Sequence, residues 1–258
     1  MSRVRLIHLT DPHLYADATG ALRGVATYPA LLQTVARARA RDWPCDAILL
    51  TGDLVQDDPG GYASIRRALG DLGRPVYCLP GNHDLPDAMQ RELGSPPFVL
   101  GGSVDIGGWR IVLLDSTVPG CAGGRLSERS LGELDAALAG APSMPALVCL
   151  HHHPVAVSSR WLDEVGLANP HELFGVVDAH RNVRAVLFGH VHQRFEGVRR
   201  QVRLLGTPST CTQFLPRSDD FAIAPLPPAY RTLELEPDGT LHTEVVWVDP
   251  SSASTAAA

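Results

Sequence analysis

Five short apolar runs, each followed at once by residues able to bind a metal ion, constrain the fold of this chain more than any other feature. Short apolar runs bounded by glycine or proline are typical of buried strands. Ligands of open α/β folds gather at the carboxyl ends of strands, so the pattern predicts five loops that deliver Asp, Asn and His side chains to one place. The runs and the residues after them are Val4–Leu9 with Asp11 and His13, Ala47–Thr51 with Gly52 and Asp53, Val76–Leu79 with Gly81, Asn82, His83 and Asp84, Ala146–Leu150 with His151, His152 and His153, and Val183–Phe188 with Gly189, His190 and His192.

Amphipathic stretches lie between these runs, and the alternation of the two predicts an α/β fold. A sixth strand is expected over 111–114. After His192 the pattern changes to shorter β-like pieces, and Glu236-Pro-Asp-Gly239 between the last two predicts a hairpin turn. The expected helices span 28–41, 61–72, 86–93, 128–139 and 170–179, and the expected late strands span 195–198, 202–205, 230–235 and 241–248.

The length of 258 residues is at the upper end of what one hydrophobic core supports. We therefore expect a single domain over 1–250, followed by a disordered C-terminal tail over 251–258. The formal charge of −6 argues against a protein that holds nucleic acid through a broad basic surface. It does not argue against a phosphate substrate, because bound metal ions supply positive charge locally.

The expected location is the cytoplasm, without a membrane partner. The five cysteines are scattered and form no Cys-x-x-Cys pair, which fits reduced thiols better than a disulfide framework. No apolar run approaches the roughly 18 residues that a membrane span needs. The N-terminus passes directly into a strand-like stretch without a signal-peptide core.

The mixture of candidate ligands itself indicates which metals fit. Carboxylate oxygen and neutral imidazole suit borderline divalent ions such as manganese, iron, zinc or cobalt. Gly52, Gly81 and Gly189 are expected to let the backbone turn sharply and approach the site closely. In Asp11-x-His13 and His190-x-His192, alternate residues of an extended strand end would face the same side.

The motifs D-x-H, G-D, G-N-H-D, H and G-H-x-H, in this order from Asp11 to His192, resemble the calcineurin-like metallophosphoesterase superfamily. The resemblance implies a four-layer αββα fold, in which a double β-sandwich is flanked by helices. It implies two divalent or mixed-valence transition-metal ions, with manganese or iron favoured and zinc or cobalt as alternatives. One ion would be bound by Asp11, His13, Asp53 and His192, and the other by Asp53, Asn82, His151 and His190. Asp53 would bridge both ions, which requires a carboxylate with two usable oxygens.

The resemblance leaves some roles open. The ligand of the fourth motif generally follows the strand directly, which favours His151, and His152 is the alternative. His83, paired with Asp84, is expected beside the metals as the catalytic pair, to stabilise the transferring phosphoryl group or protonate the leaving oxygen. His8 lies within an expected strand, and three further histidines lack companion ligands: His171, His180 and His242. All four are expected to be structural or exposed.

The chemistry that follows is metal-assisted hydrolysis of a phosphate ester. Two metal ions would share a bridging hydroxide, lower its pKa and aim it at phosphorus. No Ser or Cys nucleophile motif is present, so no covalent enzyme intermediate is expected. The intact ligand motifs argue against a non-catalytic scaffold of the same fold.

Further segments resemble bacterial class III cyclic nucleotide phosphodiesterases, in the branch that acts on 3′,5′-cyclic AMP. They are 22–27, 161–163, 169–173, 206–211, Gln213 with Phe214, and 230–233. The implied reaction opens the cyclic ester, a small-molecule nucleotide, to 5′-AMP. The alternative is a broad-specificity phosphodiesterase that acts on linear diesters, 2′,3′-cyclic nucleotides or glycerophosphodiesters.

Three features near the implied substrate site have two interpretations each. Trp161, Phe214 and Tyr230 are either base-pocket residues or core and interface aromatics. Segment 207–210 either crosses the floor of the site or forms a turn. Segment 155–168 is either a rim over the pocket or a dimer contact, and a homodimer is compatible with the resemblance.

Overall fold

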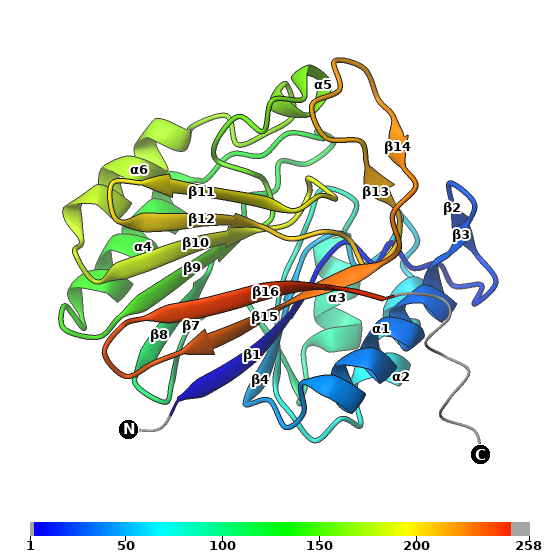
Figure 1. Ribbon diagram of the computed structural model, residues 1–258, viewed down its shortest axis with the longest axis horizontal. Coiled ribbons are helices and arrows are strands. Elements are labelled where there is room, and N and C mark those ends of the chain that lie inside the picture. The colour runs from blue at the N-terminus through cyan, green and yellow to red at the C-terminus, as the bar shows by residue number, and fades with distance from the viewer. Residues whose placement is uncertain (1–2, 249–258) are drawn as a thin grey trace.

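Two six-stranded sheets face each other in the computed structural model, which describes residues 3–248 (Figure 1). The tail expected over 251–258 lies outside the described residues. The first sheet has parallel strands at its centre and one edge, and an antiparallel pair at the other edge. Its order is β16 (Leu241–Trp247), β15 (Ala229–Leu235), β1 (Val4–Leu9), β4 (Ala47–Thr51), β5 (Val76–Leu79) and β6 (Phe98–Leu100).

The second sheet has four parallel strands in the middle and an antiparallel strand at each edge. Because the central strands of each sheet are parallel, the loops at their carboxyl ends lie along one edge of that sheet. The order is β11 (Phe195–Arg199), β12 (Val202–Gly206), β10 (Val183–Phe188), β9 (Ala146–Leu150), β8 (Trp109–Leu113) and β7 (Gly102–Ile106).

Helices cover the outer face of each sheet (Figure 1). α1 (Thr27–Arg41), α2 (Gly61–Leu69) and α3 (Pro86–Leu93) cover the first sheet, and α4 (Glu128–Ala139) and α6 (Pro170–Ala179) cover the second. Proline at the first turn suits the start of α3 and α6, because the missing N–H has no partner at that position. The short α5 (Arg160–Asp163) and the hairpins β2 (Ala21–Leu22)–β3 (Val25–Ala26) and β13 (Gln213–Phe214)–β14 (Ile223–Ala224) lie in the connecting loops.

Three hydrophobic clusters separate the four layers. Alternate residues of β1 divide between two of them: Leu6 packs between the sheets, whereas Ile7 packs under the helices of the first sheet. The third cluster joins the outer face of the second sheet to α4 and α6. This arrangement confirms the expected four-layer αββα fold.

None of the helices between residues 3 and 248 is both long and apolar enough to cross a membrane.

Candidate metal centre

The carboxyl ends of β1, β4, β5, β9 and β10 bring acidic and imidazole side chains from both sheets together. Within each of four overlapping groups, one ligand atom per residue lies within 4.8 Å of the others. The groups are Asp11–His13–His192, Asp11–Asp53–His151, His13–Asp53–His83 and His151–His152–His190. Side chains from loops far apart in the sequence therefore converge, as the strand-end pattern predicts.

Asp53 lies between the two ligand sets that the resemblance implies. Its Oδ2 is 3.8 Å from His13 Nε2 and 3.3 Å from His151 Nε2. On the first side, His192 Nε2 is 3.0 Å from His13 Nε2 and 3.3 Å from Asp11 Oδ1. On the second side, His151 Nε2 is 3.2 Å from His190 Nδ1. A carboxylate in this position can reach ligands on both sides.

Asn82 and His190 each carry a buried polar atom that fits a metal ligand. Asn82 Oδ1 and His190 Nε2 have no hydrogen-bond partner among residues 3–248, although buried polar atoms are normally paired. Backbone carbonyls hold two neighbouring rings: His192 Nδ1 donates to Thr212 O at 2.8 Å, and His151 Nδ1 donates to Thr51 O at 2.9 Å. These bonds turn the Nε2 atoms of both rings toward the carboxylates, the usual arrangement of metal-binding histidine.

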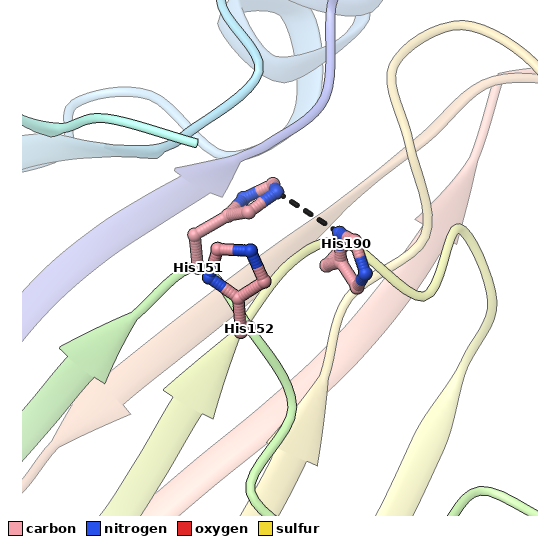
Figure 2. A group of neighbouring side chains, drawn as sticks. All are labelled: His151, His152 and His190. Carbon is pink, nitrogen blue, oxygen red and sulfur yellow. Dashed lines mark hydrogen bonds between the residues drawn. The ribbon is translucent and has the colours of Figure 1, made fainter. Parts of the chain in front are cut away.

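The structure favours His151 over His152 as the ligand that follows β9. Figure 2 shows the His151 and His190 rings joined by a hydrogen bond, with His152 beside them. Both nitrogens of His152 are already engaged, Nδ1 with Ser116 Oγ at 2.8 Å and Nε2 with Ala122 O at 3.2 Å. His151 Nε2 instead faces other candidate ligands, 3.3 Å from Asp53 Oδ2 and 3.2 Å from His190 Nδ1, whereas neither partner of His152 is a candidate ligand.

The ligand positions do not have the extended backbone expected from the alternation of ligands. β1 ends at Leu9 and β10 ends at Phe188, before the candidate ligands begin. Five of these residues have left-handed backbone, at Asp11 (φ 53°), His13 (φ 49°), Asp53 (φ 51°), His190 (φ 66°) and His192 (φ 44°). This conformation is uncommon for residues other than glycine and costs about 1–3 kcal/mol each, so it marks a site where geometry is constrained by function.

The expectation for the three glycines is confirmed. A Cβ added at Gly52, Gly81 or Gly189 would collide with the side chain of His151, Asp53 or Thr10, respectively. Gly52 also has a φ of +89°. Only glycine therefore lets these turns approach the ligands so closely.

The buried charges hold most of the side chains in the protonation state of metal ligands. Burial raises the pKa of Asp53, but the imidazoles of His151 and His13 outweigh it and hold the pKa well below its usual range. Burial lowers the pKa of His13 to about 4. His151 is the exception: burial lowers its pKa, but the Asp53 and Asp11 carboxylates raise it to about 9. Metal binding at this place would displace that proton.

The expected pairing of His83 with Asp84 is wrong. His83 Nδ1 contacts Asp57 Oδ2 at 2.9 Å and Gln56 Nε2 at 3.0 Å. Asp57 and Gln56 were missed because they belong to none of the sequence motifs; the only signal is a carboxylate four residues after Asp53. His83 itself lies beside the candidate ligands, with its ring centroid 5.4 Å from that of His13.

Asp84 holds two loops together. Its carboxylate accepts hydrogen bonds from the backbone N–H groups of Gly81 (2.9 Å) and Leu54 (3.1 Å) and from Tyr62 Oη (2.8 Å). Burial raises its pKa to about 7. The loops that it joins carry Asp53 and Asn82, so its contacts support the ligands from behind.

Segment 207–212 crosses the floor of the site. Ser209 Oγ donates to Asp11 O at 2.6 Å, and the Thr210 N–H donates to Thr10 O at 3.1 Å. Of the candidate base-pocket aromatics, Phe214 stacks on His192 with centroids 4.1 Å apart, and Trp161 meets Phe214 edge-on. Tyr230 is fully buried in the core under the first helical layer, so of its two interpretations the structure confirms the core residue.

Residues 4–194 match the family described as Calcineurin-like phosphoesterase. A 3′,5′-cyclic adenosine monophosphate phosphodiesterase CpdA from Pseudomonas aeruginosa is 42% identical over 248 residues, which cover 95% of this chain and 90% of the relative. A 3′,5′-cyclic-nucleotide phosphodiesterase from Nostoc sp. is 39% identical over 243 residues, covering 94% of this chain and 91% of the relative.

Among solved structures, a dimetal phosphatase from Danio rerio superposes with a TM-score of 0.66 at 15% identity, covering 95% of this chain and 99% of that chain. At this identity the likeness concerns the fold alone. The converging Asp and His side chains described above fit the binuclear metal centre that calcineurin-like phosphoesterases use. The chain belongs to the calcineurin-like phosphoesterase family.

Proposed function

We propose that this chain is a metal-dependent phosphodiesterase that hydrolyses 3′,5′-cyclic AMP to 5′-AMP. The observation that carries the proposal is the 42% and 39% identity, over more than nine-tenths of this chain, to two relatives named as 3′,5′-cyclic nucleotide phosphodiesterases. The arrangement of the site supports the same reaction, because the side chains of Asp11, His13, Asp53, His151, His190 and His192 form overlapping groups of close ligand atoms.

One metal ion would be held by Asp11, His13, Asp53 and His192, of which Asp11, His13 and His192 form one group of close ligand atoms. The other would be held by Asp53, Asn82, His151 and His190; His151 Nε2 lies 3.3 Å from Asp53 Oδ2 and 3.2 Å from His190 Nδ1. Manganese and iron suit this donor set best, and zinc and cobalt also fit it. When bound, the two ions supply positive charge for the phosphate oxygens and lower the pKa of the attacking water.

His83 is the proposed catalytic acid. Asp57 accepts from Nδ1 at 2.9 Å, which orients the ring. The Nε2–H is then left to donate to the oxygen that departs when the P–O3′ bond breaks. The His83 N–H also donates to Asp53 Oδ1 at 2.9 Å, so the same loop orients the bridging carboxylate.

Phe214 and Trp161 are the proposed contacts of the nucleotide base. Phe214 stacks on one face of His192. Trp161 and Phe221 pack edge-on against Phe214, with ring centroids 5.0 Å and 5.5 Å from that of Phe214. An aromatic group this close to a metal ligand suits a substrate that joins a phosphate to a planar ring.

We also propose a cytoplasmic location and a homodimer as the form in solution. The location is supported by the five cysteines, all of them free between residues 3 and 248. The dimer rests only on the resemblance of the chain to its family.

The test is product analysis after the manganese-loaded protein is incubated with 3′,5′-cyclic AMP, with a chelator-treated control. Cyclic GMP, 2′,3′-cyclic AMP and bis(p-nitrophenyl) phosphate run in parallel. Chelator-sensitive release of 5′-AMP, faster than turnover of the other esters, is the expected result. Turnover of the nitrophenyl diester with little action on cyclic AMP would keep the metal site and replace the substrate with a broader set of diesters.

A further inference from the structure

A buried cation and a buried histidine lie behind the metal centre, between the two sheets. Arg231 on β15 and His8 on β1 are both 0% exposed. A buried guanidinium is costly unless it is paired, and Arg231 Nη1 pairs with Glu196 at 3.4 Å. Its remaining hydrogen bonds go to neutral acceptors, and the one to Thr207 begins a continuous path toward the candidate ligands.

The path consists of five consecutive hydrogen bonds that end on Asp11. Arg231 Nε contacts Thr207 Oγ1 at 3.1 Å, and Thr207 Oγ1 contacts His8 Nδ1 at 2.8 Å. His8 Nε2 contacts Thr51 Oγ1 at 2.6 Å. The last two bonds join Thr51 Oγ1 to Thr10 Oγ1 at 3.0 Å and Thr10 Oγ1 to Asp11 Oδ2 at 2.7 Å.

The donor chemistry fixes the direction of every bond in this path. The ionised Asp11 carboxylate only accepts, so Thr10 gives its one hydrogen to Asp11, Thr51 gives its own to Thr10, and His8 Nε2 donates to Thr51. His8 Nδ1 is then an acceptor for the Thr207 hydroxyl, which itself accepts from the guanidinium of Arg231. Burial lowers the pKa of His8 to about 3, so the ring is neutral and carries its single hydrogen on Nε2. That hydrogen is donated to Thr51 Oγ1. All donors thus point from the cation to the carboxylate.

We infer that this directional chain of hydrogen bonds positions Asp11 as a metal ligand, with Thr207 and His8 acting as positioning residues that never touch the metal. The inference rests on the proposed function, because it assigns Asp11 to the first metal ion. Hydrogen bonds in series polarise one another, so the guanidinium strengthens the bond that Thr10 donates to Asp11 Oδ2. Oδ1 then remains turned toward His192 Nε2, 3.3 Å away.

The chain also links the two sheets at the site. Thr207 follows β12 of the second sheet, whereas His8, Thr51 and Arg231 belong to the first sheet. A shift of one sheet against the other would break the bond at Thr207. The position of Asp11 therefore depends on how the two sheets are placed relative to each other, and not only on the loop that carries Asp11.

The test compares Thr207→Val, which removes the hydroxyl at nearly constant shape, with Thr207→Ser, which keeps the hydroxyl. The affinity for Mn²⁺ is measured by calorimetric titration, and the visible spectrum of the Co²⁺-loaded protein reports the ligand geometry. Because outer hydrogen-bond partners of metal ligands typically contribute 10–100-fold to affinity and Thr207 is remote, Thr207→Val is expected to weaken Mn²⁺ binding by about tenfold. Thr207→Ser should bind Mn²⁺ with an affinity close to that of the wild type.

Thr243→Val is the matched control. Thr243 Oγ1 also accepts from Arg231, at 3.1 Å, but lies outside the path to Asp11. It should leave the Mn²⁺ affinity and the Co²⁺ spectrum unchanged. Unchanged affinity in Thr207→Val, or an equal loss in Thr243→Val, would overturn the inference.

Two further outcomes are informative. If Thr207→Val does not fold, the same comparison is made nearer to Asp11: Thr51→Val removes a hydroxyl from the path of hydrogen bonds, and Thr51→Ser keeps it. Weaker Mn²⁺ binding in Thr51→Val than in Thr51→Ser then supports the inference, and equal affinities overturn it. If the wild-type protein binds no Mn²⁺, the proposed function fails and the inference fails with it. Wild-type binding that is indifferent to both pairs of variants refutes the inference alone.

Discussion

Gly189→Ala should damage the metal centre through a single added methyl group. A Cβ at Gly189 would lie 2.7 Å from Asp11 Oδ2 and even closer to Thr10 Oγ1, whereas ordinary contacts begin at 3.4 Å. The shortfall at Asp11 is 3.4 − 2.7 = 0.7 Å. Neither neighbour has room to retreat, because Thr10 and Asp11 are both 0% exposed.

The magnitude follows from two effects of this collision. Overpacking of a buried site costs about 1–3 kcal/mol, which corresponds to a fall in Tm of about 2–12 °C for a chain of this size. A ligand displaced by 0.7 Å exceeds the tolerance of roughly 0.2 Å for metal–ligand distances. Because misplacement of about 1 Å costs on the order of 100-fold in rate, turnover of cyclic AMP should fall by a similar factor.

The assay measures the Tm, the bound metal by elemental analysis and the rate of 5′-AMP release from the same preparation. Gly132→Ala is the control, since Gly132 lies within α4 and a Cβ there meets nothing within 4 Å. It should raise the free energy of unfolding by about 0.5–1 kcal/mol, as expected for Gly→Ala inside a helix, without changing the rate. Wild-type metal content and turnover in Gly189→Ala would refute the reasoning.

Three further predictions concern the charged groups. Asp53→Ala should reduce the occupancy of both metal ions, since its carboxylate lies between both ligand sets; two full equivalents in elemental analysis would contradict the bridging role. His83→Ala should lower turnover by about 10²–10⁴-fold while both metal ions are retained. The control is His171→Ala, which changes an exposed histidine and should turn over substrate at the wild-type rate. Equal rates in the two variants would exclude a catalytic role for His83. Since burial lowers the pKa of His8 to about 3, the unfolded chain binds this proton and the folded chain does not between about pH 6.5 and pH 3. The stability that depends on neutral His8 is therefore present above pH 6.5 and lost as the pH falls. Urea titrations at pH 5 and pH 6 give the free energy of unfolding at each pH. Between them it should rise by about 1.2 kcal/mol more in the wild type than in His8→Asn, because the unfolded histidine is mostly protonated over this interval. Equal rises in the two proteins would count against a neutral His8.

The central strands could be predicted from the sequence because burial on both faces makes them continuous apolar runs. β1, β4, β5, β9 and β10 have the expected bounds, and α3, α4 and α6 also begin and end as expected. The β8 strand starts at Trp109, two residues before the expected 111. The edge strands β6 and β7 were missed, because β6 is only three residues long and the half-exposed β7 carries no apolar run.

The site was predictable in its composition but not in its fine geometry. Motifs place Asp11, Asp53 and His190 at strand ends, and parallel strands then bring them together. The left-handed backbone at these residues, the contact of Asp57 with His83 and the engagement of both His152 nitrogens depend on loops packed against each other across the sandwich. Local sequence patterns do not encode such contacts, which arise from tertiary packing.

The placement of the candidate ligands on both sheets has a consequence for folding itself. Asp11 and Asp53 follow strands of the first sheet, whereas His151, His190 and His192 follow strands of the second. Metal ions held between these sets would act as a clamp that the unfolded chain cannot use. By mass action, a ligand present at 100 times its dissociation constant stabilises the folded state by about 2.7 kcal/mol. The supply of metal would then set how much of this protein persists in the folded form, in addition to how fast each molecule turns over substrate.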